Sequence, residues 1–217
     1  MFIGHHAVAF GSKKIAPRTS LGTALMAANW LDLIWPIFLI LGIEHVRLSG
    51  ATNPFLAADF YDYPWTHSLL MSIVWSLAFA AVYWMITKYA RGAVISGLLV
   101  FSHWVLDFVT HIPDLPLAPG SSTKVGLQMW KSPLATIVVE SILFFIGTVV
   151  YLRATRARDR TGYFAFAGLV VFVVAIYVAS IVGPPPPKAD AIGYAGLAAW
   201  LFPVWGYWID RHREPVP

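Results

Sequence analysis

The sequence predicts an all-α polytopic membrane protein with about six transmembrane helices and a short N-terminal half-inserted segment. Of the 217 residues, 58% are hydrophobic and 12% are charged, whereas a soluble domain carries about 25% charged residues. The mean hydropathy is +0.67. Aromatic residues make up 15% of the chain, and their rings favour the headgroup level of a bilayer. Charges this sparse cannot cover a water-exposed surface, so lipid must surround much of the protein.

Six apolar stretches account for the predicted helices, because crossing the hydrocarbon core takes about 20 mostly apolar residues. They are Leu21–Ile43, Thr66–Thr87, Gly92–Ile112, Pro133–Leu152, Tyr163–Val182 and Ala191–Ile209. Short connectors that are polar or marked by Pro and Gly separate them. We find no repeat of solenoid type and no separate soluble part, so residues 1–217 are expected to form one integral membrane domain.

The N-terminal segment Met1–Phe10 is too short to cross a bilayer and is apolar apart from His5 and His6. At about 1.5 Å per residue it reaches roughly half-way into the core. This favours a re-entrant or half-inserted segment over an amphipathic helix lying on the surface. Because Lys13 and Lys14 follow the apolar residues and no small-residue cleavage site is present, the segment is not expected to be a signal peptide.

The positions of Lys and Arg predict the orientation of the chain. With the N-terminus inside, the inner segments contain eleven of the fifteen basic residues: Lys13, Lys14, Arg18, Lys88, Arg91, Arg153, Arg156, Arg158, Arg160, Arg211 and Arg213. The outer loops contain Arg47, Lys124, Lys131 and Lys188. Basic residues are enriched in cytoplasmic loops, so both termini are expected in the cytoplasm. The net charge of +4 comes from these loops and does not indicate nucleic-acid binding.

The candidates for chemistry are His and acidic residues, because the chain contains no Cys and therefore no disulfide, thiolate zinc site or thiol nucleophile. A charged group at the bilayer centre costs about 2.5–3.5 kcal/mol on insertion scales. Ionisable residues inside the apolar stretches are therefore expected to face the bundle interior and to have a partner.

One stripe of such residues lies in the third stretch. His103, Asp107 and His111 are spaced four residues apart and share one helical face, and Asp114 continues the stripe just past Pro113. Imidazole nitrogen and carboxylate oxygen are both good zinc ligands, so His103 and Asp107 can reach one cation. The same spacing fits a proton relay or a His–Asp hydrogen bond that ties helices together.

Other stretches offer further candidates for the same site. Asp32 lies deep in the first stretch, at the depth that a half-inserted N-terminal segment gives to His5 or His6. His67 opens the second stretch within the triplet Thr66-His67-Ser68 and belongs to the outer side. Taken alone, His67 fits an interfacial residue.

The sequence also indicates roles for three further acidic residues. Glu140 in the fourth stretch fits an orienting partner of a metal ligand and, equally, a protonated side chain bonded to a neighbouring helix. Glu44, with His45, is expected at the interface. Asp62 or Thr66 is expected to cap the second helix.

These residues resemble a bacterial inner-membrane family called the membrane-bound metal-dependent hydrolases. The likeness rests on an N-terminal His, an Asp in an apolar stretch, a T-H-S triplet and an S-H-x-x-x-D helix. The matching residues are His5 or His6, Asp32, Thr66-His67-Ser68, and Ser102-His103 with Asp107. The run DFVTHIPDLPL at 107–117 adds to it, and the H-x-x-x-D helix is also similar to that of zinc-dependent phospholipase C. The likeness covers residues 1–115, so residues 116–217 are expected to supply supporting helices.

Two positions depart from the family's pattern. The family commonly has a D-x-D-H run where this chain reads Asp32-Leu33-Ile34-Trp35. It also often has an H-R pair upstream of the triplet, where this chain reads Asp62-Tyr63. Both differences remove possible ligands, which counts more against a site with two ions than against a site with one.

The resemblance implies a hydrolase of the inner membrane that uses one or two divalent ions, with zinc expected. The implied ligands are His5 or His6, Asp32, His67, His103 and Asp107. Such an ion lowers the pKa of bound water towards about 7 and polarises a phosphoryl or acyl oxygen. Asp114, His111 or Glu140 would serve as general base or as an orienting residue. The depth of the site suits a phosphoester or ester of a lipid-like substrate.

Two other functions fit the same residues. A proton- or ion-coupled transporter would use the intramembrane His and Asp side chains to carry its ions, although no inverted repeat is visible. A non-catalytic membrane partner or assembly subunit would use them as a structural metal site or hydrogen-bonded staple.

Overall fold

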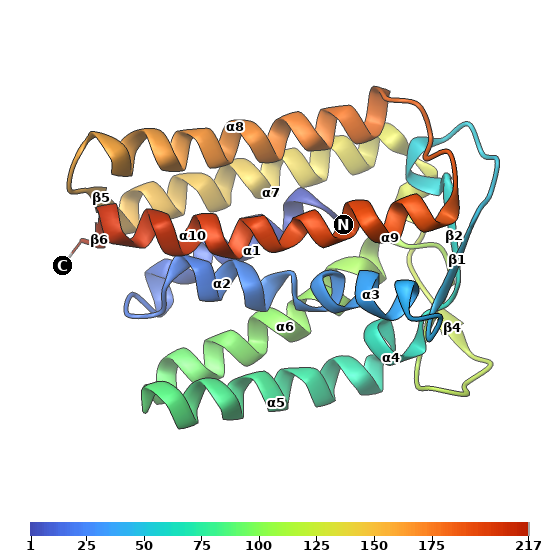
Figure 1. The fold of residues 1–217 in the computed structure, drawn as a ribbon, viewed down its shortest axis with the longest axis horizontal. Helices are drawn as coiled ribbons and strands as arrows, with labels where there is room; N and C mark the ends of the chain where they lie inside the picture. Colours follow the sequence, from blue (N-terminus) through green and yellow to red (C-terminus); the bar gives the residue numbers. More distant parts are fainter. Residues whose placement is uncertain (217) are drawn as a thin grey trace.

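The computed structural model describes residues 1–216, which form a bundle of helices joined at both ends by short loops (Figure 1). The helices are α1 (Ile3–Ile15), α2 (Leu21–Ala28), α3 (Trp30–Ile40), α4 (Pro64–His67), α5 (Leu69–Thr87), α6 (Ala90–Thr110), α7 (Pro133–Ala154), α8 (Arg160–Val182), α9 (Ala189–Leu197) and α10 (Leu201–His212). The all-α polytopic fold is confirmed.

Three antiparallel pairs of short strands and three 3-10 turns lie in the loops. The strands are β1 (His45–Leu48) with β2 (Ala58–Asp62), β3 (Leu115–Pro116) with β4 (Lys124–Val125), and β5 (Thr155–Ala157) with β6 (Arg213–Pro215). The 3-10 turns are η1 (Pro54–Leu56), η2 (Met129–Lys131) and η3 (Ala198–Trp200). In Figure 1 the end of the bundle on the left carries β5 and β6, and the opposite end carries β1, β2 and β4.

Four helices, α5 to α8, are each long and apolar enough to cross a bilayer, and α2 with α3 adds a fifth if that bent pair is one span. The expected sixth span, Ala191–Ile209, is divided by η3 into α9 and α10. Neither piece alone reaches the length that a span requires. In Figure 1 the two pieces follow one another along the bundle beside α8.

The first predicted span, Leu21–Ile43, is broken at Asn29. Helices α2 and α3 meet there at 57°, and Asn29 has non-helical backbone angles of φ −104° and ψ 12°. Its side-chain amide donates to the carbonyl of Leu25 at 2.9 Å. An Asn that bonds to nearby backbone competes with the helix ladder, which accounts for a break at this residue. The break leaves the carbonyl of Ala28 free to bond elsewhere.

The N-terminal segment is a helix inside the bundle. Helix α1 packs against α7, α2 and α6, and most of its side chains are buried, among them those of Ile3, His5, His6 and Phe10. The approach to α7 is close, since a Cβ atom added at Gly147 would lie 2.4 Å from the carbonyl oxygen of Ala7. The alternative of an amphipathic helix on the membrane surface is therefore wrong, and the helix continues beyond Phe10 to Ile15.

Candidate metal centre

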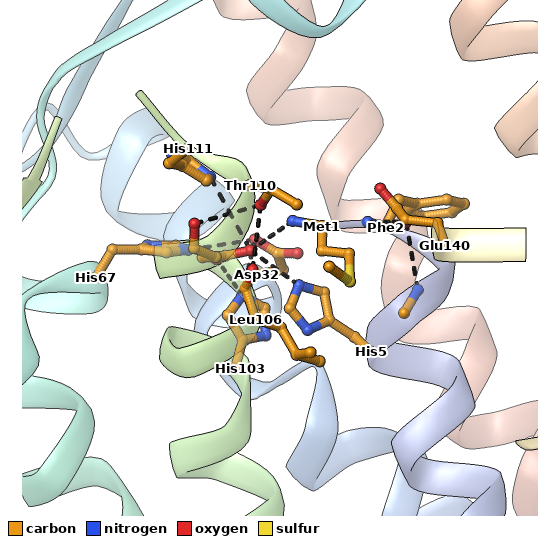
Figure 2. A network of polar contacts seen from close by, with 12 residues as sticks. Met1, Phe2, His5, Asp32, His67, His103, Leu106, Thr110, His111 and Glu140 are labelled. Atoms are coloured by element: carbon orange, nitrogen blue, oxygen red, sulfur yellow. Dashed lines mark hydrogen bonds and ion pairs between the residues drawn. The ribbon is translucent and has the colours of Figure 1, made fainter. Parts of the chain in front are cut away.

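A cluster of His and Asp side chains lies inside the bundle, where α1, α3, α4 and α6 meet. Figure 2 shows His5, Asp32, His67, His103 and His111 approaching one centre from these elements and from the loop after α6. All of these side chains are buried except that of Asp32, which is 40% exposed. Residues far apart in the sequence are brought together as predicted.

The carboxylates of Asp32 and Asp107 form the middle of the cluster. His103 Nε2 lies 3.1 Å from Asp107 Oδ2 and 3.6 Å from Asp32 Oδ1. His67 Nε2 lies 3.4 Å from the same oxygen of Asp32 and 3.9 Å from Asp107 Oδ2. Asp32 Oδ1, His67 Nε2 and His103 Nε2 thus form a compact set of three potential ligand atoms.

The other ring nitrogen of His103 is held by main chain. Its Nδ1 donates to the carbonyl of Ala28 at 2.9 Å, the group that the break at Asn29 leaves free. A carbonyl can only accept, so Nδ1 carries a proton and Nε2 is turned towards the carboxylates. This Nε2 is buried and has no hydrogen-bond partner among residues 1–216.

His67 is oriented by a chain of two further side chains. Its Nδ1 lies 2.7 Å from Thr66 Oγ1, which in turn donates to Glu44 Oε2 at 2.7 Å. Because the hydroxyl proton goes to Glu44, the oxygen accepts from His67 Nδ1–H. His67 therefore also turns its Nε2 towards the carboxylates. A metal-ligating His is usually held in this way by a partner on its other nitrogen.

Glu44 and its neighbours correct three sequence expectations. Glu44 is fully buried rather than interfacial, and burial raises the pKa of its carboxyl group above the usual range. Its Oε1 accepts from the backbone N–H groups of Trp65 and Thr66 at 2.7 and 2.8 Å. It thereby caps α4, the role expected of Asp62 or Thr66. The long helix expected from Thr66 begins only at Leu69, so His67 lies in the separate turn α4.

His111 reaches the cluster although α6 ends at Thr110. Its Nε2 lies 4.0 Å from Asp107 Oδ1, and its Nδ1 lies 2.9 Å from Asp114 Oδ1. Tyr63 donates to that same oxygen of Asp114 at 2.9 Å. Burial, together with the charge of Asp114, raises the pKa of Tyr63 well above its usual range, so its hydroxyl keeps its proton. Asp114 therefore acts on the cluster by orienting His111.

Of the two N-terminal histidines, His5 joins the cluster. Its Nε2 lies 3.2 Å from Asp107 Oδ1, and the amino group of Met1 lies 2.5 Å from the same oxygen. His6 points elsewhere: its Nδ1 bonds to the carbonyl of Phe2 at 3.2 Å, and its ring packs edge-on against Phe202.

Glu140 lies beside the start of α1. Its Oε2 accepts from the backbone N–H groups of Phe2 and Gly4 at 2.9 and 3.3 Å, so α7 fixes the N-terminal turn that carries His5. Figure 2 shows Glu140 on the far side of Met1 from the histidines. It does not contact a histidine of the cluster, yet it borders the same cavity.

A cavity of about 200 Å³ opens onto the cluster. Its polar wall contains Asp32, His67, Asp107, His111 and Glu140. The rest of the wall is mostly apolar or aromatic and is formed by Met1, Phe2, Trp35, Phe55, Phe60, Tyr63, Trp130, Tyr177 and Ser180. The cavity therefore suits a ligand that combines a polar group with an apolar part.

The donor set fits a divalent cation. His67, His103 and His111 each face an acceptor with Nδ1, while Nε2 faces a carboxylate oxygen at 3.1–4.0 Å. Without a cation, each ring would have to be doubly protonated or would place a lone pair against negative charge. Ligands at about 2.0–2.2 Å from zinc lie about 3.3 Å from one another at tetrahedral angles, which is close to these spacings.

The roles of two residues in this arrangement could not be predicted from the sequence pattern. Tyr63 stands where the family pattern often has a basic pair, and it supports His111 through Asp114. Glu44 looks like the polar end of an apolar stretch, and only the folding of residues 44–65 brings it under α4.

Comparison with known proteins identifies a family. The sequence profile of the family described as YdjM inner membrane protein matches residues 63–184, which is more than half of the chain. The matched region contains His67, His103, Asp107 and Glu140, whereas His5 and Asp32 precede it. No curated protein and no solved structure matches the chain. With its apolar helices, this match shows that the chain belongs to the YdjM inner membrane protein family and crosses the bacterial inner membrane several times.

Proposed function

We propose that this protein is a metal-dependent hydrolase of the inner membrane, acting on a phosphoester or ester of a lipid-like substrate. The observation that carries the proposal is the common orientation of three histidines. In His67, His103 and His111, Nδ1 is held by an acceptor outside the cluster and Nε2 faces the carboxylates of Asp32 and Asp107.

The residues that would hold a divalent ion, with zinc expected, are Asp32, His67, His103 and Asp107. These are nitrogen and oxygen donors, which zinc accepts. A bound ion would supply Lewis-acid chemistry, polarising a phosphoryl or acyl oxygen and activating water. The chain's own residues would orient the donors through Glu44 and Ala28 and exclude bulk water by burial.

Proton transfer is assigned to Glu140 among the three candidates for catalysis. Both of its hydrogen bonds to the main chain are accepted by Oε2, which leaves Oε1 to accept a proton from a reactant in the cavity. Asp114 does not border the cavity and is committed to His111 and Tyr63. His111 borders it, but with an Nε2 that already faces Asp107.

The substrate class follows from the site's surroundings. Phe55, Phe60, Trp35 and Trp130 line the cavity next to its polar wall, and apolar membrane helices surround the bundle. A lipid would place its ester or phosphoester at the cluster and its apolar part against these rings.

The proposed orientation has the cluster in the outer half of the membrane, with the C-terminus and the Lys13–Lys14 end of α1 in the cytoplasm. The expected cytoplasmic N-terminus does not fit this arrangement, because the amino group of Met1 is buried at Asp107 in the cluster. The eleven basic residues expected inside lie at or beside the α1–α2, α5–α6 and α7–α8 junctions and at the end of α10. The bias of Lys and Arg supports this orientation. Alkaline phosphatase fused after Arg213 should remain in the cytoplasm and therefore be inactive. An active fusion would show that the C-terminus lies outside and would reverse the orientation.

Metal analysis tests the proposed site. Full-length protein purified in detergent should contain a divalent transition metal by mass spectrometry, and His103→Ala should lose it. His212→Ala is the matched control, because His212 pairs with Asp159 away from the cluster and should keep the metal. Chelation should lower the melting temperature of the wild type, since a ligand at 1,000 times its Kd stabilises by about 4 kcal/mol. It should not affect His103→Ala.

Hydrolysis tests the proposed reaction. Metal-loaded protein should release water-soluble product from phospholipid vesicles, and Glu140→Gln should keep its metal while losing most of the rate. Metal binding without hydrolysis of any lipid ester or phosphoester would instead indicate a structural site. Proton-coupled flux in liposomes that disappears in His103→Ala would indicate a transporter.

A further inference from the structure

An apolar groove runs along the outside of the bundle, between α5 on one side and α2 and α10 on the other. Helix α5 packs chiefly against α6, whereas α2 packs against both α6 and α10. Figure 1 shows α5 along the lower edge of the bundle. The groove has a volume of about 430 Å³, and its wall on α5 is one helical stripe from Trp75 to Thr87. It shares no lining residue with the cavity at the His–Asp cluster, so it is a separate feature.

The two ends of the groove differ in chemistry. At one end, Trp30 packs edge-on against Trp75 and Phe79, with ring centroids 6.1 and 5.4 Å apart. At the other end, the hydroxyl group of Tyr207 lies 2.9 Å from Thr23 Oγ1. Both hydroxyl-bearing residues line the groove. The groove is therefore closed by aromatic rings at one end and bordered by hydroxyl groups at the other.

Two positively charged side chains lie beside the end with the hydroxyl groups. Lys88 is the C-cap of α5. The guanidinium of Arg18 lies 4.6 Å from the ring centroid of Tyr89. Tyr89 and Tyr83, which lines the groove, both lie against Gly92. Arg18 and Lys88 are exposed, and the ion pairs that Lys and Arg side chains make within residues 1–216 include neither of them. This end of the groove thus carries positive charge that no carboxylate neutralises.

The length of the groove matches the hydrocarbon layer of one leaflet. Trp75 and Thr87 lie twelve positions apart on α5, which corresponds to about 18 Å along the helix axis. One half of a hydrocarbon core of about 30 Å is about 15 Å deep. Tyr side chains gather at the headgroup level, and Tyr83 and Tyr207 are at the charged end. The groove therefore extends from the headgroup level to about the bilayer midplane.

The volume of the groove excludes a helix of a partner chain as its occupant. With its side chains, a helix is at least about 10 Å wide, so a length of about 18 Å occupies roughly 1,400 Å³. That is about three times the volume of the groove. A thin and flexible acyl chain fits instead, and exposed cations at the headgroup level attract anionic lipids.

We propose that the groove binds one anionic phospholipid of the surrounding membrane. Its phosphate lies beside Arg18 and Lys88, and an acyl chain lies along α5 as far as Trp30. The lipid fills the space between α5 and the helices α2 and α10, and thereby holds α5 against the bundle. This lipid is distinct from the substrate proposed at the cluster, and its binding does not depend on metal or on hydrolysis.

Lipid retention by the full-length protein in detergent tests the headgroup assignment. Delipidated protein is mixed with phosphatidylglycerol, or with phosphatidylcholine of the same acyl chains, and bound lipid is counted by native mass spectrometry. Wild type should retain one phosphatidylglycerol per chain and bind phosphatidylcholine more weakly. Arg18→Gln and Lys88→Gln should each weaken phosphatidylglycerol binding about fivefold. Lys131→Gln is the matched control and should bind as wild type does, because Lys131 is exposed in η2, before α7.

Blocking the groove tests the place of the acyl chain. Ala78 is exposed on the groove wall, so Ala78→Trp should fill the groove and abolish the retained phosphatidylglycerol. Ala81→Trp is the matched control, because Ala81 is exposed on α5 outside the groove. Arg18→Gln leaves the shape of the groove unchanged and therefore decides the outcome if Ala78→Trp fails to fold.

Three results would overturn the proposal. The first is equal retention of phosphatidylglycerol by wild type and by folded Ala78→Trp. The second is equal affinity of wild type and Arg18→Gln for phosphatidylglycerol, or of wild type for the two lipids. The third is a wild-type dimer that Ala78→Trp abolishes, which would show that a second copy of the chain covers the groove. Each result would leave the proposed hydrolase function standing.

Discussion

Two buried polar clusters in this protein differ in whether the chain completes them. Arg213, the first residue of β6, donates Nε and Nη2 to Thr155 Oγ1 at 3.2 and 2.9 Å. It also donates Nη1 to the carbonyl of Gly162 and Nη2 to that of Thr155, at 3.2 and 3.1 Å. In the His–Asp cluster, by contrast, His103 Nε2 is buried without a hydrogen-bond partner among residues 1–216.

The difference separates a structural polar group from the proposed binding site. Arg213 has its hydrogen-bond partners within the chain and joins β5, β6 and the start of α8. In His67, His103 and His111, by contrast, Nδ1 has an acceptor and Nε2 is turned towards the carboxylates.

The largest effect is predicted for a substitution that breaks the cluster around Arg213. Arg213→Met leaves the acceptors of Thr155 and Gly162 without donors, and also removes the guanidinium from the faces of Tyr151 and Phe166. Unfolding free energy in detergent should fall by about 3 kcal/mol, measured by thermal or denaturant unfolding. Metal content should stay at the wild-type value.

The control for Arg213 is Arg211→Met, because Arg211 is exposed and should change stability little. Loss of metal in Arg213→Met, at a temperature where it is still folded, would show that the two clusters are not independent.

A smaller effect is expected from weakening the incomplete cluster at its edge. Glu44→Gln keeps the shape of the side chain but removes the carboxylate that accepts the hydroxyl proton of Thr66. Thr66 Oγ1 is then no longer held as an acceptor for His67 Nδ1. Metal affinity should fall about tenfold, measured by competition with a chelator of known affinity. Asp62→Asn is the control, because Asp62 pairs with His45 at an exposed position. Equal affinities for Glu44→Gln and wild type would show that the Thr66–Glu44 chain does not orient His67.

The smallest effect concerns the exposed ion pairs beside Arg213. Hydrogen bonding to Arg156 and the nearby charge of Arg158 lower the pKa of Glu214 below its usual 4.5. Because the folded pKa is the lower one, the stabilisation is present above pH 4.5 and disappears as the pH falls through the folded value. Glu214→Gln should thus melt slightly below wild type at pH 7, and the two melting temperatures should converge at acid pH. A gap that stays constant with pH would contradict this.

Helical periodicity was sufficient to predict the part of the cluster that lies on one element. The four-residue spacing of His103 and Asp107 places both on the same face of α6, whatever that face contacts. The convergence of Asp32 and His67 was expected only from the family resemblance, because depth placed Asp32 deep in its stretch and His67 at the outer side. The choice between His5 and His6 did not follow, because it depends on the rotation of α1 against α7.

The remaining errors concern breaks in helices and the folding of loops. Apolar composition continues through Asn29 and through η3, so hydropathy alone joins pieces that the backbone separates. Glu44 and Tyr63 acquire their roles only when the loop between α3 and α4 folds back under the cluster. Such contacts connect residues about 20 to 50 positions apart, and no local pattern encodes them.

The break at Asn29 has a consequence for how this protein tolerates mutation. The acceptor that fixes the tautomer of His103 is a peptide oxygen, so every amino acid at position 28 supplies it. A scan of side chains at this fully buried position would report the tightness of the core and pass over this contact. Only a change in backbone path removes the contact, and Asn29 is where that path is decided: replacing Asn29 with a strong helix former such as Leu would draw the Ala28 carbonyl back into a continuous helix. Asn29 thus acts on the orientation of the His103 ring through the main chain.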